Sequence, residues 1–199
     1  MRSKGILILA TLTILVGFVG CGATNSYNRL VQVDEQVKQS WGNLQAQYQR
    51  RADLIPNLVE TVKGAADFEQ ETLQSVTEAR AKATSIQVNA EDLNDPQKIQ
   101  QFQQAQSALG KSLGRLLAVS ENYPQLQATQ AFSDLQAQLE GTENRITVAR
   151  RDYNQAVQQY NTKVRSFPTV LFASVMGFPP KTPFEAETGA EQAPDVSFD

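Results

Sequence analysis

The chain has 199 residues, a net charge of −3, no histidine and a single cysteine. It therefore lacks the usual nitrogen and sulfur ligands for zinc, copper or haem, and the histidine of catalytic dyads and triads, so we predict no metal and no cofactor. Acidic and basic residues are interleaved, so no basic stripe is present to attract a phosphate backbone, and nucleic acid is not an expected partner.

The N-terminal residues have the pattern of a secretory leader or a membrane anchor. Basic residues within the first four positions precede an uncharged apolar run over 6–19. As a helix this run spans roughly 21 Å, less than the ~30 Å of bilayer hydrocarbon, which favours a cleaved leader. Residues 18–21 resemble a bacterial lipobox, which predicts lipidation of Cys21. An uncleaved single-pass helix stays open as the alternative, because the neutral stretch extends over 5–23. Both interpretations place the remaining chain outside the cytoplasm at a membrane.

The next part of the chain predicts helices and almost no strand. Four stretches carry apolar residues alternately three and four positions apart, as in helix bundles and coiled coils. The first, 27–65, keeps its phase across Pro56, so we predict one helix kinked where the backbone bond to Ala52 is lost. A helix break near Asp53 is the alternative.

The second stretch, 68–86, is shorter and follows a helix stop at Gly64. A loop over 89–96 comes next, with Asp95 as N-cap and Pro96 at the first helical position. The third stretch (99–123) has the most regular heptads, and the fourth (132–167) is again long.

These patterns predict an all-α fold, an antiparallel up-down four-helix bundle with long outer helices, preceded by an apolar N-terminal anchor or leader. We divide the chain into a signal peptide or membrane anchor (1–20), a helical bundle domain (21–167), and an apolar segment with a disordered acidic tail (168–199). Large seam side chains should fill the core: Trp41, Phe102, Phe132 and Tyr153. Polar seam residues should set register or reach the surface: Asp34, Arg51, Gln106, Thr142 and Lys163.

The apolar segment after the fourth helix has two interpretations. We favour packing against the foot of the bundle, and docking onto lipid or a partner is the alternative. The side chains concerned are Val170, Leu171, Phe172 and Val175.

Four strings of the sequence stand out together. They are YNRLV at 27–31, YQRRADLIPNLV at 48–59, EGTENRI with ARRDYN at 140–154, and SFP at 166–168. Together they resemble the LemA family of bacterial membrane-associated proteins, over nearly the whole mature chain. The resemblance implies a membrane anchor and a mostly helical domain, with a molecular function not established for the family as a whole. One departure lies at 63–69, where the family often has an aromatic residue and a histidine, so any role of that histidine is not expected here.

Two of these strings supply the candidate site residues. They are Arg50, Arg51, Asp53, Pro56 and Asn57 in the first helix, and Glu143, Asn144 and Arg145 in the fourth. Because Pro56 has no amide, it leaves a backbone carbonyl that an arginine or a partner's donor can take up. Gly141 should permit close approach of a neighbouring helix. We favour an inter-helix ion pair and amide clamp that aligns the bundle over a binding site.

The sequence therefore predicts a membrane-anchored, non-enzymatic helical scaffold or adaptor at the bacterial cell envelope. The expected partners are the membrane, reached through lipid or the N-terminal helix, and an unknown envelope protein; the heptads also permit a homo-oligomer. One alternative is an envelope enzyme that uses carboxylates, which needs Asp53 and Glu143 to converge near Arg51. The other is a lipid- or small-ligand-binding bundle, which needs an apolar cavity between helices.

Overall fold

The computed structural model describes residues 2–64 and 68–185, with side chains over 25–64 and 68–185. All the regular elements of this described part are helices and it contains no strand, so the predicted all-α class is confirmed. Its α-helices are α1 (Arg2–Lys63), α2 (Gln70–Ser85), α3 (Pro96–Ser120), α4 (Pro124–Gln127) and α5 (Gln130–Arg165). Two short 3-10 helices are η1 (Ala90–Asn94) and η2 (Thr169–Leu171).

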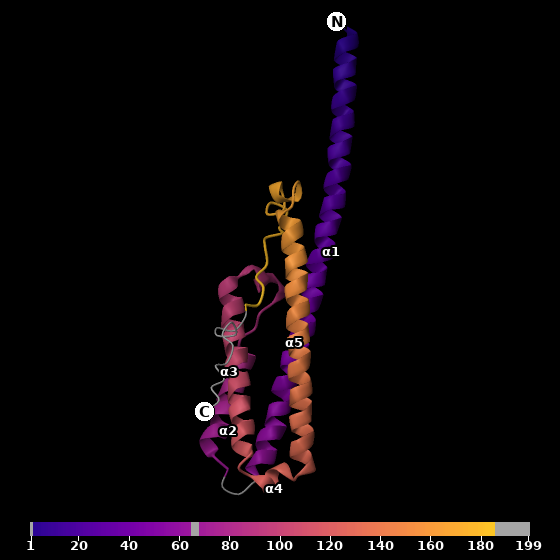
Figure 1. Ribbon diagram of the computed structural model, residues 1–199. Coiled ribbons are helices and arrows are strands. Elements are labelled where there is room, and N and C mark those ends of the chain that lie inside the picture. Colours follow the sequence, from indigo (N-terminus) through magenta and orange to yellow (C-terminus); the bar gives the residue numbers. More distant parts are fainter. Residues whose placement is uncertain (1, 65–67, 186–199) are drawn as a thin grey trace, which may run out of the picture.

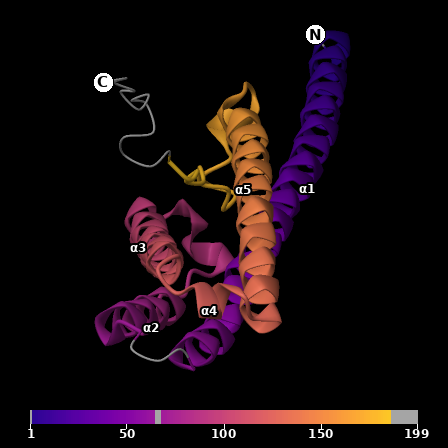
Figure 2. The ribbon, with the colours of Figure 1, turned by 60° about the horizontal axis from the view of Figure 1, so that its bottom comes forward.

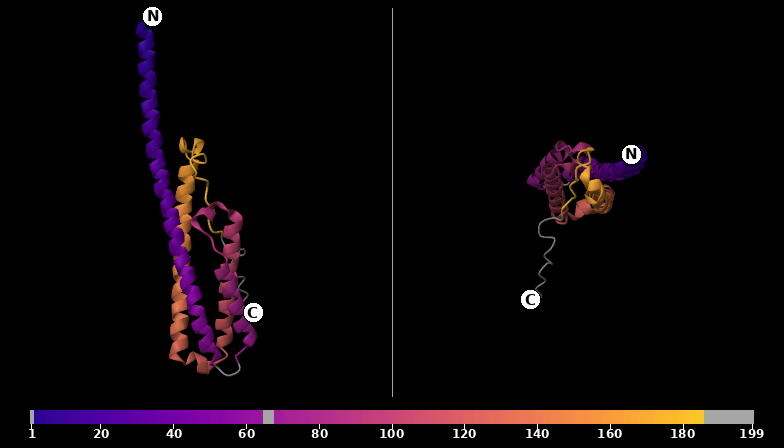
Figure 3. Two further views of the ribbon diagram at one scale, coloured as in Figure 1. Left: turned by 180° about the vertical axis from the view of Figure 1, so that it is seen from behind. Right: turned by 90° about the horizontal axis from the view of Figure 1, so that it is seen from above.

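The longest element is α1, whose N-terminal part projects beyond the body of the molecule (Figure 1). Its other half packs along α5, which runs in the opposite direction, while α2 and α3 pack on each other. Views from behind and along the axis show the same projecting rod (Figure 3). As predicted, α1 continues through Pro56, and no break occurs at Asp53. In the part of the chain that the structure describes, no helix is both apolar and long enough to cross a bilayer.

Each of the four predicted stretches corresponds to a helix, α1, α2, α3 or α5, but the short helices η1, α4 and η2 were not predicted. Asp95 caps α3, because its Oδ1 accepts hydrogen bonds from the backbone amides of Gln97 and Lys98 at 2.9 and 3.3 Å. The segment expected to be a plain loop contains η1, so that prediction was incomplete. Asn89 and Asp92 form a reciprocal capping box that stabilises this turn. At the far end, α4 joins α3 to α5 (Figure 2).

The core has an aromatic part and an aliphatic part. The aromatic part lies in the half nearer the projecting rod and includes Trp41, Tyr48, Phe102, Tyr153 and Tyr160. The aliphatic part lies toward α4 and includes Leu58, Val62, Leu109, Leu116 and Phe132. The four large seam side chains predicted to fill the core are all buried. The structure therefore confirms that these four side chains fill the core.

After α5 the chain reverses direction and returns along the bundle (Figure 1). The predicted packing of Val170, Leu171 and Val175 against the bundle is wrong, because these side chains are exposed. Gly177, with φ of 84°, turns the chain so that Phe178 and Phe184 pack in the core instead. The acidic tail expected to be disordered falls in 186–199, outside the described residues.

Candidate functional site

Arg51 is a buried cation that joins three helices. Its side chain leaves α1 with only 3% of the residue exposed. Nη1 donates to Glu143 Oε2 of α5 at 2.9 Å, and Nη2 donates to Gln106 Oε1 and to the Gln106 carbonyl of α3 at 2.8 and 3.1 Å. The guanidinium also lies 5.2 Å from the centre of the Tyr48 ring, a cation–π distance. This set fixes the relative positions of α1, α3 and α5.

Arg51 lines a groove of about 410 Å³ between α3 and α5, which we call the Arg51 groove. Gly110 and Gly114 widen it along α3. A Cβ at Gly110 would lie 3.8 Å from Arg51 Nη1, and one at Gly114 would meet nothing within 4 Å. The groove is lined further by Gln106, Leu117, Leu139, Glu140, Glu143 and Arg150.

The groove can bind through hydrogen bonds and charge. The Arg51 guanidinium is positively charged and acts only as a hydrogen-bond donor. Its Nε is buried and has no hydrogen-bond partner among the described residues. Glu143 lies at the groove with 56% of its side chain exposed, so it remains accessible to a ligand. The exposed Glu143 carboxylate can therefore accept a hydrogen bond from a ligand in the groove.

Other predicted site residues lie elsewhere on the surface. Asp53 is exposed, accepts a hydrogen bond from Gln49 at 2.7 Å and does not line the groove. Arg50 donates to Gln138 of α5 at 3.2 Å. Asn144 and Arg145 lie on another face of α5, in a hollow shared with α1. The structure thus brings together Arg51 and Glu143 but not Asp53.

Three further predicted positions complete this comparison. Asn57 is exposed on α1. The expected close approach at Gly141 is wrong, because a Cβ there would meet nothing within 4 Å. Cys21 lies within α1, but its side chain is outside the described residues, so its lipidation remains a prediction.

The carbonyl that Pro56 leaves free is taken up by another helix. Arg80 of α2 donates from Nε to the Ala52 carbonyl at 2.8 Å. Residue 52 is four positions before the proline, which is where the missing helical hydrogen bond would have ended. Sequence reasoning placed an arginine here in principle but did not identify Arg80, because its helix has few apolar markers of register.

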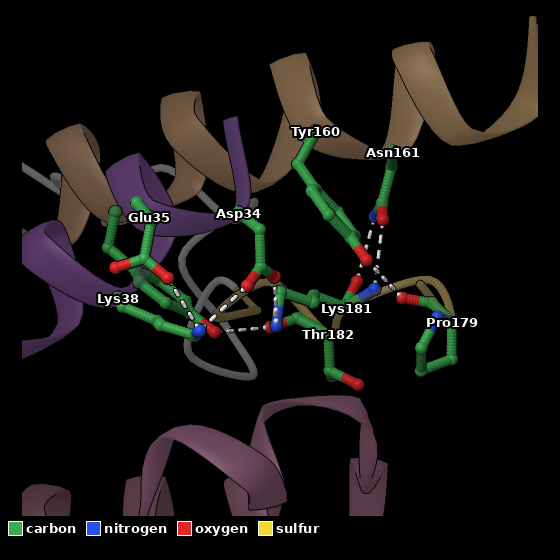
Figure 4. A network of polar contacts seen from close by, with 9 residues as sticks. Asp34, Glu35, Lys38, Tyr160, Asn161, Pro179, Lys181 and Thr182 are labelled. Atoms are coloured by element: carbon green, nitrogen blue, oxygen red, sulfur yellow. Dashed lines mark hydrogen bonds and ion pairs between the residues drawn. The ribbon is translucent and has the colours of Figure 1, made fainter. Parts of the chain in front are cut away.

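A second polar network holds residues 178–185, which we call the strap. Asn161 of α5 donates to the Lys181 carbonyl at 2.8 Å and accepts from the Lys181 amide at 2.9 Å (Figure 4). Seven residues earlier, Asn154 makes the same pair of bonds with Phe184, at 2.9 and 2.8 Å. The two asparagines therefore replace the strand partner that an extended peptide would otherwise need.

Two buried tyrosines of α5 add to this network. Tyr153 donates to the Thr182 carbonyl and Tyr160 to the Pro179 carbonyl, both at 2.9 Å. Burial raises the pKa of both phenols, so they remain protonated donors at neutral pH. Sequence reasoning placed Tyr153 in the core but missed the hydrogen bonds that these tyrosines make, although a signal was present. The dipeptide Tyr-Asn occurs at 153–154 and again one heptad later at 160–161.

An ion-pair network ties the strap to α1. Lys181 Nζ lies 3.0 Å from Asp34 Oδ1, and Lys38 Nζ lies 2.9 Å from Asp34 Oδ2 (Figure 4). Burial alone would raise the pKa of Asp34, but hydrogen bonds and charges from Lys38 and Lys181 outweigh it and lower this pKa below 3.8. Hydrogen bonds to Glu35 and Asp34 raise the pKa of Lys38. Asp34 therefore stays ionised and links the strap to the long helix.

Comparison with known proteins places these residues in a family. Magnetosome protein MamQ 2 of Paramagnetospirillum magneticum is 28% identical over 168 residues, which covers 76% of this chain and 62% of that protein. Protein LemA of Metamycoplasma hominis is 25% identical over 142 residues, which covers 71% of this chain and 61% of the relative. This chain thus spans about three fifths of the length of these relatives.

The sequence model of the LemA family matches residues 40–198. The match includes Arg51, Glu143, both Tyr-Asn pairs and the strap. The chain belongs to the LemA family.

Proposed function

We propose that this chain is a membrane-anchored, non-enzymatic helical scaffold or adaptor at the bacterial cell envelope, built as an up-down four-helix bundle. Its Arg51 groove holds a segment of an envelope protein. The observation that supports this proposal is the groove itself, whose lining combines a guanidinium fixed by three helices with accessible charged and apolar side chains. A surface positioned in this way loses little conformational entropy when a partner binds.

The chemistry of the groove suggests the kind of partner segment. Lys111 and Arg150 supply positive charge at the groove, and Leu117 and Leu139 supply apolar surface. A segment that places an acidic or carbonyl group toward Lys111 and Arg150 and apolar side chains toward the two leucines fits both features. The carboxylate-based enzyme receives no support, because Asp53 is exposed and outside this groove.

The anchor in this proposal is the N-terminal segment, held by lipid on Cys21 or by an uncleaved apolar helix. The rest of α1 then joins this anchor directly to the bundle, because the helix continues without a break to Lys63.

The test is site-specific photocrosslinking of the full chain in native membranes. A photoreactive amino acid at Lys111 probes the groove, and the same residue at the exposed Gln158 of α5 probes a different surface. We expect a discrete crosslinked protein from Lys111 alone. Gly114→Leu should abolish this crosslink by filling the groove, whereas Gly42→Leu should preserve it, because both glycines have free space around them. Equal crosslinking from both positions, or no effect of Gly114→Leu, would contradict the proposal.

A further inference from the structure

The residues between α5 and the strap form an exposed apolar surface, which we call the apolar tip (167–176). Five large side chains within these ten positions are exposed: Phe167 81%, Val170 49%, Leu171 70%, Val175 87% and Met176 41%. Single exposed apolar residues are ordinary on soluble proteins, but a contiguous group of this kind marks an interaction surface.

Among the residues that the structure describes, the charge flanking the apolar tip is positive. Although charges are interleaved over the chain as a whole, no Asp or Glu occurs in residues 1–33 or 153–184, the two segments that form this end of the molecule. Exposed basic side chains flank the tip at Arg29, Lys163 and Arg165. Apolar side chains with a basic border and no acidic residue are typical of segments that lie at the surface of an anionic bilayer.

The apolar tip also lies on the side of the molecule from which α1 projects (Figures 1 and 3). The ring of Tyr27 on α1 is 5.6 Å from the ring of Phe178, directly after the tip. From Cys21 to Tyr27 the helix rises only about 9 Å. Since the polar zone of a bilayer is roughly 5–7 Å deep on each side, a tip at this level lies within a few ångströms of it when the anchor is in place.

We propose that the apolar tip inserts into the headgroup layer of an anionic bilayer, as a second membrane contact beside the N-terminal anchor. This inference rests on the proposed membrane anchorage. The strap holds the tip in place, because Lys181 pairs with Asp34 and Phe178 packs on Tyr27, both on α1. Two attachment points fix the tilt of the bundle, and so they determine which direction the Arg51 groove faces.

The test uses the full chain reconstituted into vesicles of phosphatidylcholine and phosphatidylglycerol in equal parts. Val175→Trp adds a tryptophan at the tip, and Gln127→Trp adds the same probe at the exposed end of α4. Trp41 is buried and gives both variants the same background. We expect brominated lipid to quench the tip probe several times more strongly than the α4 probe. Lys163→Glu combined with Arg165→Glu should weaken this quenching, most of all at low salt.

Other outcomes overturn the inference in separate ways. If iodide in the water quenches both probes equally in reconstituted protein, the tip is not in the membrane. If neither iodide nor brominated lipid reaches the tip probe, protein covers it. If charge reversal changes nothing, the basic residues have no role in docking. Failure of the unmodified chain to sediment with vesicles would instead refute the membrane anchorage on which the inference rests.

Discussion

The space between α3 and α5 differs between its two halves. In the half toward the projecting rod, the strap fills it, and Phe184 packs among Trp41, Phe102 and Tyr153. In the half toward α4, the space remains open as the Arg51 groove. The same two helices therefore border a filled and an unfilled section, and Arg150 belongs to both, since it contacts the Phe184 ring and lines the groove.

This difference shows how the chain uses polar side chains in a helical protein. In the filled half, asparagine and tyrosine side chains form hydrogen bonds with the backbone of the strap. In the open half, Arg51 donates hydrogen bonds to Gln106 and Glu143, and its Nε has no partner among the described residues. Filled space stabilises the fold, whereas the open space is free for a ligand.

The largest effect on stability is expected from removing the Phe184 side chain, which holds the strap in the core. Phe184→Ala should lower the free energy of unfolding by about 3–5 kcal/mol, because it leaves a cavity among three aromatic rings. Urea denaturation followed by circular dichroism measures this change. Phe167→Ala is the matched control, since that ring is exposed and should cost almost nothing. Similar losses for both variants would mean that the strap does not support the core.

Next in size is the effect of the buried cation at the groove. Arg51→Met should destabilise the protein by about 2–3 kcal/mol, because Gln106 loses donors to both its side-chain and its main-chain oxygen. Glu143→Gln should cost less than about 1 kcal/mol, since that side chain is largely in water. Denaturation midpoints of the two variants check this ranking. A larger effect of Glu143→Gln would show that the ion pair, and not the contact with Gln106, aligns the helices.

The contribution of the asparagine–strap hydrogen bonds to stability can be tested with substitutions in α5. Asn161→Ala removes two hydrogen bonds to the Lys181 backbone and should cost about 1–2 kcal/mol. Asn144→Ala, at an exposed position of the same helix, should be close to neutral. Hydrogen exchange at the Lys181 amide provides a local measurement. If that amide stays protected in Asn161→Ala, the strap is held by other contacts.

A smaller effect on the stability of the fold is expected when the pH is lowered. The pKa of Asp34 is lower in the folded chain than its ordinary value of 3.8, so its ion pairs stabilise the fold above that value. This stabilisation should be lost as pH falls from 3.8 through the folded pKa. Asp34→Asn should remove about 1 kcal/mol at neutral pH and flatten the pH dependence in that window. Thermal melts of both chains across acidic pH measure this, and parallel curves would refute a role for Asp34.

Sequence patterns were sufficient for the helices and much of the core, because packed helices repeat their apolar residues with a fixed period. The heptad phase across Pro56 gave the continuity of α1, and Asp95 with Pro96 gave the start of α3. The strap has no such period. Its prolines at 179, 180 and 183 are typical of a linker, and hydropathy alone does not tell which apolar residues face the core.

The candidate site was predictable only in part for a related reason. Arg51 and Glu143 could be named from their positions in the sequence, but their pairing depends on the relative rotation of α1 and α5. The groove depends in addition on Gly110 and Gly114. In the regular heptad pattern of α3 these two positions look like ordinary surface positions. A glycine pair one turn apart, on a helix with an otherwise strong pattern, is the signal that indicates space beside a helix.

The smallest expected effect on stability comes from two glycine substitutions, which together distinguish stability from partner binding. Gly114→Ala should raise the free energy of unfolding by about 0.5–1 kcal/mol, because alanine favours the helix and a Cβ there meets nothing within 4 Å. Gly42→Ala on α1 should give a similar gain, since its surroundings are equally open. Only Gly114→Ala narrows the Arg51 groove, so only this variant should weaken the crosslink from Lys111. If both stabilised variants lost that crosslink, helix rigidity rather than open space would govern partner binding.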